Sequence, residues 1–398
     1  MKASLTLLLS GLILIGSIAA TGWWATGNPS SRPQAPLGAE AWASVVATIA
    51  PDLRRADVPA LTAAPSEVAA FVERLTPRQR DDLVRLAPTT IGNLDGIPLT
   101  MRYAANESVL AETTTPTVEQ ALAVDAPTNT AALAPVRWVV APSATPTDHG
   151  GRPRGIEMER TAGTGQVRPG RTLAYDPRGD GRVVQVIGDL ERAKHIAVLV
   201  PGSSWRLDNV LRWPSGHRVS PLANALVLQS ALGDDAAIVV WLGYDAPERV
   251  DLAAVGSARA IAGEGALRRF LNSLPDAHVS LLCHSYGSVV CGRALPGSPV
   301  DEVVAIGSPG MDVGKASDLR TTARVWAART ADDPIRITPA VRVLGLGHGT
   351  SPVNPKFGAR VFRTGTATGH DQYYAEGTES LANIARIVLG HAGEVTLR

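Results

Sequence analysis

The chain has 398 residues, of which 45% are hydrophobic and 19% are charged. This excludes a disordered chain and leaves room for two or three domains, or for one large α/β domain with appendages. The 38 basic and 37 acidic residues nearly cancel to a net charge of +1. The chain as a whole therefore lacks the excess of positive charge that is typical of proteins that bind nucleic acid. The 2 cysteines exclude a disulfide-scaffolded miniprotein and a cysteine-rich zinc module.

The N-terminus carries an apolar run from Leu5 to Ala20 behind a single lysine. The run is shorter than the roughly 20 residues of a membrane span and is typical of a signal peptide, with small residues near its end for cleavage. Without cleavage, residues 3–24 would form an N-terminal anchor, a membrane tether; a buried core helix is the alternative. We therefore predict that residues 1–26 are a signal peptide or an anchor, and that the protein is secreted or associated with the cell envelope.

A helical pattern runs from residue 39 to residue 110. In its middle, Thr76 as N-cap, a proline at the first helical position and Gln79 three residues after the cap predict the start of a helix. The stretch Ile91–Pro98 is dense in turn formers and predicts a tight loop. Such a helical region is either a cap over a substrate pocket or a separate packing layer.

Two segments have compositions that argue against a packed core. Residues 27–38 are rich in Pro, Ser and Gly, which predicts a tether. Residues 111–170 are rich in Thr, Ala, Pro and Gly, which predicts an insertion or linker with at most one strand, at residues 136–140.

From residue 171 to residue 398, short apolar runs alternate with helical stretches. Strands are predicted at residues 183–187, 196–200, 237–242, 279–282, 303–306, 325–328 and 360–362. Helices are predicted at residues 220–232, 258–274, 288–295 and 380–389. This pattern predicts an α/β fold with a mostly parallel central sheet covered by helices, preceded by the N-terminal helical region. Chemistry in such sheets lies at the edge where the strands end.

The strongest catalytic candidate is Ser285, in the stretch Cys283-His284-Ser285-Tyr286-Gly287. An apolar strand precedes this stretch and an apolar helix follows it, as in the nucleophile elbow G-x-S-x-G, with Cys283 in place of the first glycine. The alternative is a strand-to-helix turn with a capping serine. The adjacent His284 is expected to support the site rather than to act as its base, because neighbouring elbow residues point in different directions.

The general base is expected later in the chain than the serine. His370 follows the last predicted strand and precedes the last predicted helix, so its loop is able to reach Ser285 Oγ. His348 is the fallback, and His391 comes too late to lie over the edge of the sheet. We therefore predict that His370 is the base.

An acid must orient the imidazole of that base. Asp333, just past the strand at residues 325–328, fits the order Ser, Asp, His along the chain and is the first choice. The second choice is Asp332, and Asp312 is a weaker third. An oxyanion hole needs two backbone N–H donors, for which Tyr286, and Ser203 in the Pro-Gly turn after the strand at residues 196–200, are the candidates.

With these residues in place, the sequence resembles the α/β-hydrolase superfamily, and more narrowly an actinobacterial group of exported α/β-hydrolases of undefined substrate. The motifs that carry the resemblance are IGNLDGIP, YDPRGDG, VPGSS, GYDAP, CHSYGS, GSPG and GHDQYY. The resemblance covers about residues 39–110 and 171–398, and it implies Ser285, Asp333 and His370 as the catalytic triad. Cys283 departs from the commoner glycine, and residues 111–170 look like an insertion that the group does not need.

The two cysteines lie two residues before and six residues after the predicted nucleophile. The spacing of Gly287 and Cys291 turns Cys291 toward the strand that carries Cys283, so an exported protein would be able to close a disulfide between them. Two buried free thiols are the equal alternative.

These residues predict an exported serine hydrolase that cleaves an ester, with a thioester or an amide as alternatives, through an acyl-enzyme. An acyltransferase with the same triad and a non-catalytic envelope binding protein on a hydrolase fold are the competing interpretations. The expected substrate is a small or acylated molecule, and we predict no cofactor, no metal site, no nucleic acid and no protein partner. The eight histidines show no H-x-x-x-H spacing.

Overall fold

The structure is a computed structural model that describes residues 35–112, 136–137, 161–162, 170–211, 219–248, 252–338 and 347–398. The predicted signal peptide or anchor and most of the predicted tether lie outside these residues. So does the predicted insertion, apart from its two ends and a short antiparallel pair, β1 (Val136–Arg137) and β2 (Thr161–Ala162). Within the described residues, no helix is both long and apolar enough to cross a bilayer.

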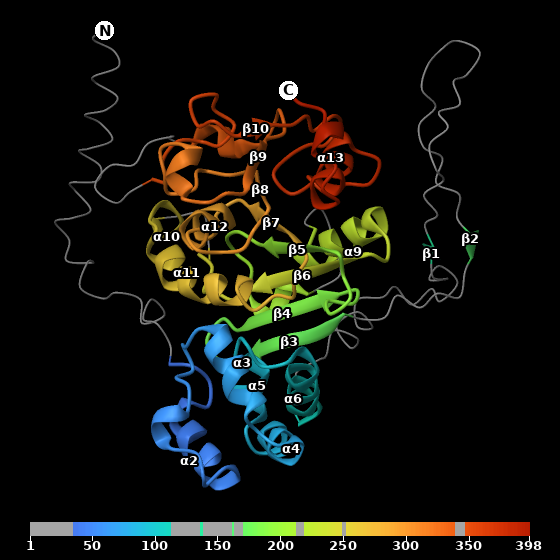
Figure 1. Cartoon of the computed structure of the whole chain (residues 1–398). Coiled ribbons are helices and arrows are strands. Elements are labelled where there is room, and N and C mark those ends of the chain that lie inside the picture. Colours follow the sequence, from blue (N-terminus) through green and yellow to red (C-terminus); the bar gives the residue numbers. More distant parts are fainter. Residues whose placement is uncertain are drawn as a thin grey trace, which may run out of the picture. The chain divides into compact units, whose positions relative to one another are not determined.

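The centre of the fold is a sheet of eight strands in the order β10-β9-β8-β7-β5-β6-β4-β3 (Figure 1). All neighbouring pairs from β10 to β6 are parallel, while β4 pairs antiparallel with both β6 and β3. The strands are β3 (Arg171–Asp176), β4 (Arg182–Ile187), β5 (His195–Val200), β6 (Ala236–Leu242), β7 (His278–His284), β8 (Glu302–Ile306), β9 (Arg324–Ala328) and β10 (Arg360–Val361). The predicted fold class is therefore confirmed, together with each strand predicted between residues 183 and 362.

Helices cover both faces of this sheet, which explains why its inner strands are continuously apolar. On one face, α9 (Pro221–Leu232) packs against α13 (Glu379–Val388) and the strands beneath. On the other, α11 (Ala258–Leu271) packs against α12 (Gly287–Ala294), which lies on β5 and β7 (Figure 1). Two short helices, α8 (Leu207–Val210) and α10 (Leu252–Val255), lie in the connections. Every residue of β6 is buried, so the hydrophobic core lies within these layers.

The N-terminal helices have a hydrophobic cluster of their own, built around Trp42, Phe71 and Ile91. They are α2 (Ala39–Ile49), α3 (Pro65–Glu73), α4 (Pro77–Leu86), α5 (Pro88–Asn93) and α6 (Leu99–Glu112). The predicted start of α4 is confirmed, because the side chains and backbones of Thr76 and Gln79 form a capping box. The predicted loop at Ile91–Pro98 is wrong in its first part: Pro88 begins a new helix that runs to Asn93, and the turn starts only at Leu94.

This helical region covers the outer edge of β3, the last strand of the sheet (Figure 1). The side chain of Asn93 accepts a hydrogen bond from Tyr175 N at 2.9 Å and donates one to Tyr175 O at 2.8 Å. Asn106 Nδ2 donates to Leu173 O at 3.0 Å. Two asparagines thus take the place of a further strand and protect backbone groups that would otherwise form an open edge.

Replacing Asn93 by alanine is expected to lower the free energy of unfolding by about 1–3 kcal/mol, because it removes both partners of the Tyr175 backbone. Urea denaturation of the wild type and the variant measures this loss. The matched control is Asn272→Ala, since Asn272 Nδ2 also bonds to backbone oxygens but at an exposed site. Equal stability of the Asn93 and Asn272 variants would contradict the role of Asn93 at the edge.

Candidate active site

Ser285 lies in a sharp turn between the end of β7 and the start of α12. Its φ of 53° is in the left-handed region, an uncommon conformation for a residue that is not glycine. Ser285 N donates to Ile306 O of β8 at 3.0 Å, which fixes the turn to the neighbouring strand. A Cβ on Gly287 would lie 2.4 Å from Val200 O, so only glycine permits the close passage of helix and strand. The predicted strand, turn and helix around the serine are present.

Cys283 and Cys291 form a disulfide directly beneath this turn. Both residues are fully buried, one at the end of β7 and the other in α12. The bond ties the strand that leads into Ser285 to the helix that leads out of it. Of the two alternatives that the sequence left open, the structure has the disulfide.

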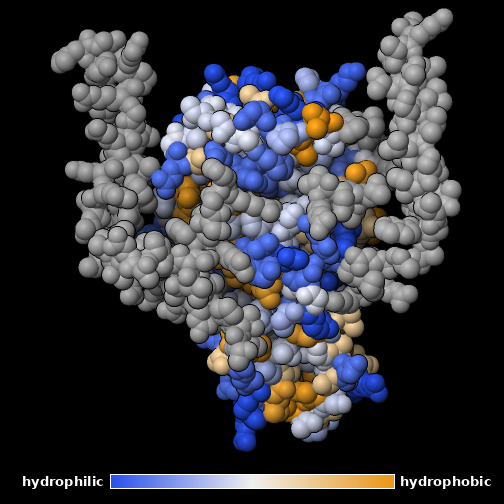
Figure 2. Space-filling model, turned by 180° about the vertical axis from the view of Figure 1, so that it is seen from behind, coloured by the Kyte–Doolittle hydropathy of each residue, from blue (hydrophilic) through white to orange (hydrophobic). Residues whose placement is uncertain are grey.

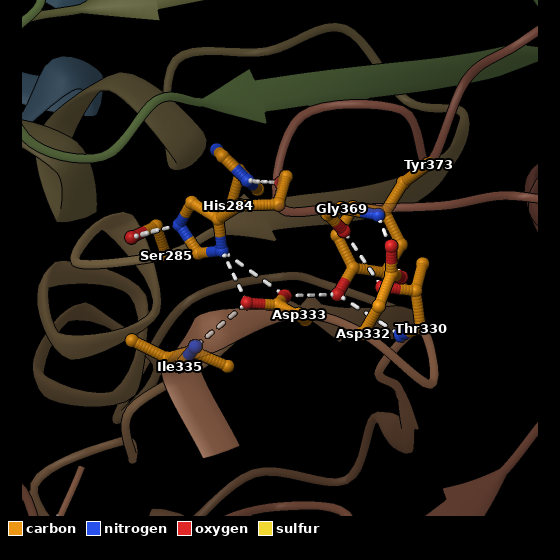
Figure 3. Close-up of polar contacts among 9 residues, drawn as sticks. His284, Ser285, Thr330, Asp332, Asp333, Ile335, Gly369 and Tyr373 are labelled. Carbon is orange, nitrogen blue, oxygen red and sulfur yellow. Dashed lines mark hydrogen bonds and ion pairs between the residues drawn. The ribbon is translucent and has the colours of Figure 1, made fainter. Parts of the chain in front are cut away.

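The structure brings Ser285, His370 and Asp333 together at the edge where the parallel strands end. Ser285 and Asp333 are labelled in Figure 3. His370 Nε2 lies 2.9 Å from Ser285 Oγ, and His370 Nδ1 lies 2.9 Å and 3.0 Å from the two carboxylate oxygens of Asp333. His370 belongs to the loop between β10 and α13, and Asp333 follows β9. The arrangement leaves the imidazole bonded to an acid on one side and to a hydroxyl on the other.

Asp333 is completely buried, and its carboxylate receives two further hydrogen bonds. Ile335 N donates to Oδ1 at 2.8 Å, and the hydroxyl of Tyr373 donates to Oδ2 at 2.5 Å (Figure 3). Burial by itself raises the pKa of Asp333, but the hydrogen bonds from His370 and Tyr373 outweigh it and lower this pKa below its usual value. The carboxylate is therefore held in its charged form beside the imidazole.

The loop of His370 is fixed by residues next to Asp333. Asp332 accepts a hydrogen bond from Gly369 N at 2.8 Å, and Thr330 Oγ1 donates to Gly369 O at 2.6 Å. Asp332, the second choice for the acid, thus bonds the backbone next to the histidine and not the imidazole. Its pKa is lowered chiefly by the bond from Gly369.

The other candidates of the sequence lie in different surroundings. Asp312, the third choice for the acid, accepts from Ser257 Oγ at 2.9 Å and pairs with Arg293 at 2.6 Å. His348, the fallback base, has its Nε2 2.7 Å from Ala254 O and its ring against Tyr286. The known contacts of Asp312 and His348 are thus with groups outside the chain of bonds from Asp333 through His370 to Ser285.

His284, which precedes Ser285 in the chain, forms a hydrogen bond to the backbone of His370. Its Nε2 lies 2.7 Å from His370 O, and because a carbonyl only accepts, this nitrogen carries a proton and donates. The two rings are 4.7 Å apart. Burial, reinforced by the nearby His370, lowers the pKa of His284 to about 4. His284 is therefore neutral around pH 7 and donates a hydrogen bond to the backbone of His370. This contact is consistent with the predicted role of His284 as a residue that supports the site.

The low pKa of His284 predicts a pH-dependent stability. The pKa of His284 is about 4 in the folded chain and 6.5 in the reference state. As the pH falls, the unfolded chain therefore becomes protonated at this residue before the folded chain does. The contribution of His284 to stability is complete above pH 6.5 and is lost as the pH falls toward 4. Urea denaturation at several pH values is expected to show a smaller decline over this range in His284→Gln than in the wild type. The control is His391→Gln at an exposed histidine; an unchanged decline in His284→Gln would contradict the account.

Two residues that hold the site, Tyr373 and Thr330, were not among the candidates from the sequence. Tyr373 lies three residues after His370 in the motif GHDQYY, and Thr330 lies three residues before Asp333. The sequence indicates a role for these two residues only through their position in the loops that carry the acid and the base. It does not predict which atoms they bond.

The turn after β5 passes directly beside the nucleophile candidate. A Cβ on Gly202 would lie 2.6 Å from Ser285 Cβ and 3.1 Å from Tyr286 N. The hydroxyl of Tyr244 donates to Pro201 O at 2.7 Å and fixes this turn from below. The structure thus brings the turn that contains Ser203 against the elbow that contains Tyr286. Their use as oxyanion donors remains a prediction.

Gly202→Ala is expected to lower kcat/KM by about 100-fold, because the added methyl group must displace Ser285 or the turn that faces it. The measurement is ester hydrolysis by the purified variant, with circular dichroism to establish that it is folded. Gly393→Ala is the control, since a Cβ there meets nothing within 4 Å. Unchanged hydrolysis by folded Gly202→Ala would show that this turn does not border the reacting atoms.

No group of three or more His, Cys, Asp or Glu side chains in the described part of the chain is arranged to hold a metal ion. The chemistry that the site offers comes from a hydroxyl, an imidazole and a carboxylate in hydrogen-bonded sequence.

A mostly parallel sheet with a strained serine at a strand-to-helix turn, an acid after a later strand and a histidine after the last strand defines the α/β-hydrolase architecture. Residues 176–343 match the family model described as "Alpha/beta hydrolase". This match supports the resemblance to the α/β-hydrolase superfamily seen in the sequence, and it supports a hydrolase.

Relatives among curated proteins come from mycobacteria. The chain is 28% identical to "Uncharacterized protein Rv2079" of Mycobacterium tuberculosis, over 83% of this chain and 56% of that protein. It is 35% identical to "Uncharacterized protein Rv0963c" of the same species, over 38% of this chain and 63% of that protein. The chain thus spans little more than half the length of the first of these relatives.

Solved structures that resemble the chain include esterase PE8, at 15% identity and a TM-score of 0.35 over 52% of this chain and 96% of that one. Dienelactone hydrolase from Anabaena variabilis is similar at 16% identity and a TM-score of 0.35, over 58% of this chain and 100% of that one.

Proposed function

We propose that this protein is a serine hydrolase that cleaves an ester through an acyl-enzyme, with thioesters and amides as chemically related substrates. The observation that carries the proposal is the unbroken chain of contacts from Asp333 through His370 to Ser285 Oγ, at 2.9 Å on each side of the imidazole. This is the geometry in which a serine hydroxyl becomes a nucleophile.

In the first half of the reaction, His370 takes the proton of Ser285 as the oxygen attacks the carbonyl carbon. Asp333 stabilises the imidazolium that forms, and its lowered pKa keeps it charged for this task. The backbone N–H groups of Tyr286 and Ser203 are the proposed donors to the tetrahedral oxyanion. His370 then returns the proton to the leaving alcohol, and the acyl group remains on Ser285.

In the second half, His370 takes a proton from water as the water oxygen attacks the acyl carbon. His370 then gives this proton to Ser285 Oγ as the bond between Oγ and the acyl group breaks, which releases the acid and restores the serine. An acyltransferase differs only in that an alcohol replaces water at this step.

Export from the cytoplasm is part of the proposal. The disulfide between Cys283 and Cys291 supports it, since such bonds persist in oxidising compartments. The apolar run at residues 5–20 supports it as well. Fractionation of cells that carry a C-terminally tagged protein is expected to place it in the envelope or the medium; a cytoplasmic protein would overturn this part.

The test of the function is a series of p-nitrophenyl esters of graded acyl-chain length, offered to the oxidised, folded protein. Turnover of at least one ester with saturation kinetics is the expected result. Comparing turnover with and without added alcohol then separates hydrolysis from acyl transfer. A folded protein that hydrolyses none of the series and no thioester would instead be a binding protein on a hydrolase fold, contrary to the proposal.

A further inference from the structure

An open groove of about 330 Å³ lies beside the candidate triad and is lined by residues from three separate loops. This volume is in the range of small-molecule sites. The loops follow β8, follow β9, and precede β10. The residues that matter here are Ser308, Arg329, Ile335, Arg336, Ser351 and Asn354.

The residues that line the groove either contact the candidate triad or are next in the chain to residues that contact it. Ser308 follows Gly307, on which a Cβ would lie 3.0 Å from His370 Cε1. Ile335 donates its N–H to Asp333, as Figure 3 shows. Arg329 precedes Thr330, which bonds the loop of His370. A group that occupied the groove would therefore lie a short distance from the reacting atoms.

The charge of the groove has one sign. Arg329 and Arg336 both line it, and no aspartate or glutamate does so among the described residues. Neither guanidinium pairs with a carboxylate within the described part of the chain, and Arg336 is held by a bond from its Nη1 to Ala331 O at 3.2 Å. Two like charges in a hollow repel each other and attract an anion, because a cleft of one sign concentrates counter-ions.

The same wall contains the hydroxyl of Ser351. Ser351 Oγ is buried and forms no hydrogen bond to any described residue. Leaving such a group unpaired is costly, and an anionic oxygen in the groove would accept its proton. Two cationic side chains and a hydroxyl without a hydrogen bond to any described residue thus belong to the lining of one groove.

We propose that this groove binds an anionic group of the substrate, a carboxylate or a phosphate a few bonds from the scissile ester. The guanidinium groups of Arg329 and Arg336 bind the anion, and Ser351 Oγ donates to it. The proposal rests on the proposed function, since it names the class of ester that the same triad cleaves.

The test uses two matched pairs of esters that differ in one charge. In the first pair, the p-nitrophenyl monoester of adipic acid is compared with its methyl ester, so the charge is on the acyl part. In the second, 4-acetoxybenzoate is compared with its methyl ester, so the charge is on the leaving group. The wild type is expected to prefer the charged member of at least one pair by tenfold or more in kcat/KM.

Arg329→Gln and Arg336→Gln are each expected to lower kcat/KM for the charged ester by about tenfold, or about 1.4 kcal/mol, and to leave the neutral ester within about twofold. Arg85→Gln, at an exposed arginine of α4, is the control and should change neither. The proposal is overturned if the wild type hydrolyses the neutral esters without preferring either charged one, or if the preference persists in both groove variants.

Failure of the proposed function would look different, because none of the four esters would be hydrolysed. The groove is then tested by binding alone: adipate is expected to raise the Tm of the wild type and not that of Arg329→Gln. No change in the Tm of the wild type would overturn the proposal in that case.

Discussion

Replacement of Ser285 by alanine is expected to lower kcat for ester hydrolysis by about 10⁶-fold. Alanine, like serine, has a Cβ, so the backbone of the turn is under the same steric constraint in the variant. The variant lacks Oγ, which lies 2.9 Å from His370 Nε2 in the wild type. Without a nucleophile, no acyl-enzyme forms, and only slow attack by water on a bound ester remains. The measurement is single-turnover hydrolysis of the best p-nitrophenyl ester found for the wild type.

The matched control is Ser298→Ala, which also removes a serine hydroxyl bonded to a backbone oxygen, Ala294 O at 2.7 Å, just beyond α12. Its kcat is expected to stay within about twofold of the wild type, since it touches no reacting group. Substantial hydrolysis by folded Ser285→Ala would mean that another group attacks the ester.

Asp333→Asn has the second largest expected effect, a fall in kcat of about 10⁴-fold. The amide keeps the size of the side chain but presents a donor where the carboxylate accepted from His370 Nδ1 at 2.9 Å. The imidazole then carries its proton on Nε2, the nitrogen that faces Ser285, and cannot accept the proton of the serine. The imidazolium also loses the negative charge that stabilises it. Steady-state kinetics across pH 5–9 measures the loss.

Asp332→Asn is the matched control, because it changes the neighbouring carboxylate in the same way. Asp332 bonds Gly369 N at 2.8 Å, so its variant is expected to disturb the loop of His370 without reversing the tautomer. Its kcat should therefore fall much less than that of Asp333→Asn. The reverse order would assign the acid to Asp332.

Much of the fold was predictable because its inner strands are buried on both faces. The strands Ala236–Leu242 and Glu302–Ile306 are buried along their whole length, and short, largely apolar runs of this kind are typical of inner strands. The edge strand β3 was not predicted, since its residues have polar ends and only part of it is buried. Its backbone is hydrogen-bonded by the side chains of Asn93 and Asn106, which come from another part of the chain.

The candidate triad was predictable in a different way. The residue types around Ser285 and the order of strands limited the base and the acid to a few positions, and the structure brings the first choices, Asp333 and His370, to the serine. The supporting bonds were not predictable. Whether Tyr373 reaches Asp333, and where the imidazole of His284 points, depends on how separate loops pack at the edge of the sheet.

The most direct test of the central claim is the site of labelling by a fluorophosphonate, which reacts with activated serines and leaves a stable adduct. The oxidised protein is treated with the probe and digested, and the modified peptide is identified by mass spectrometry. The account predicts one adduct, on Ser285, that is absent in Ser285→Ala and strongly reduced in Asp333→Asn. An adduct on another serine, or none on the folded protein, would contradict it.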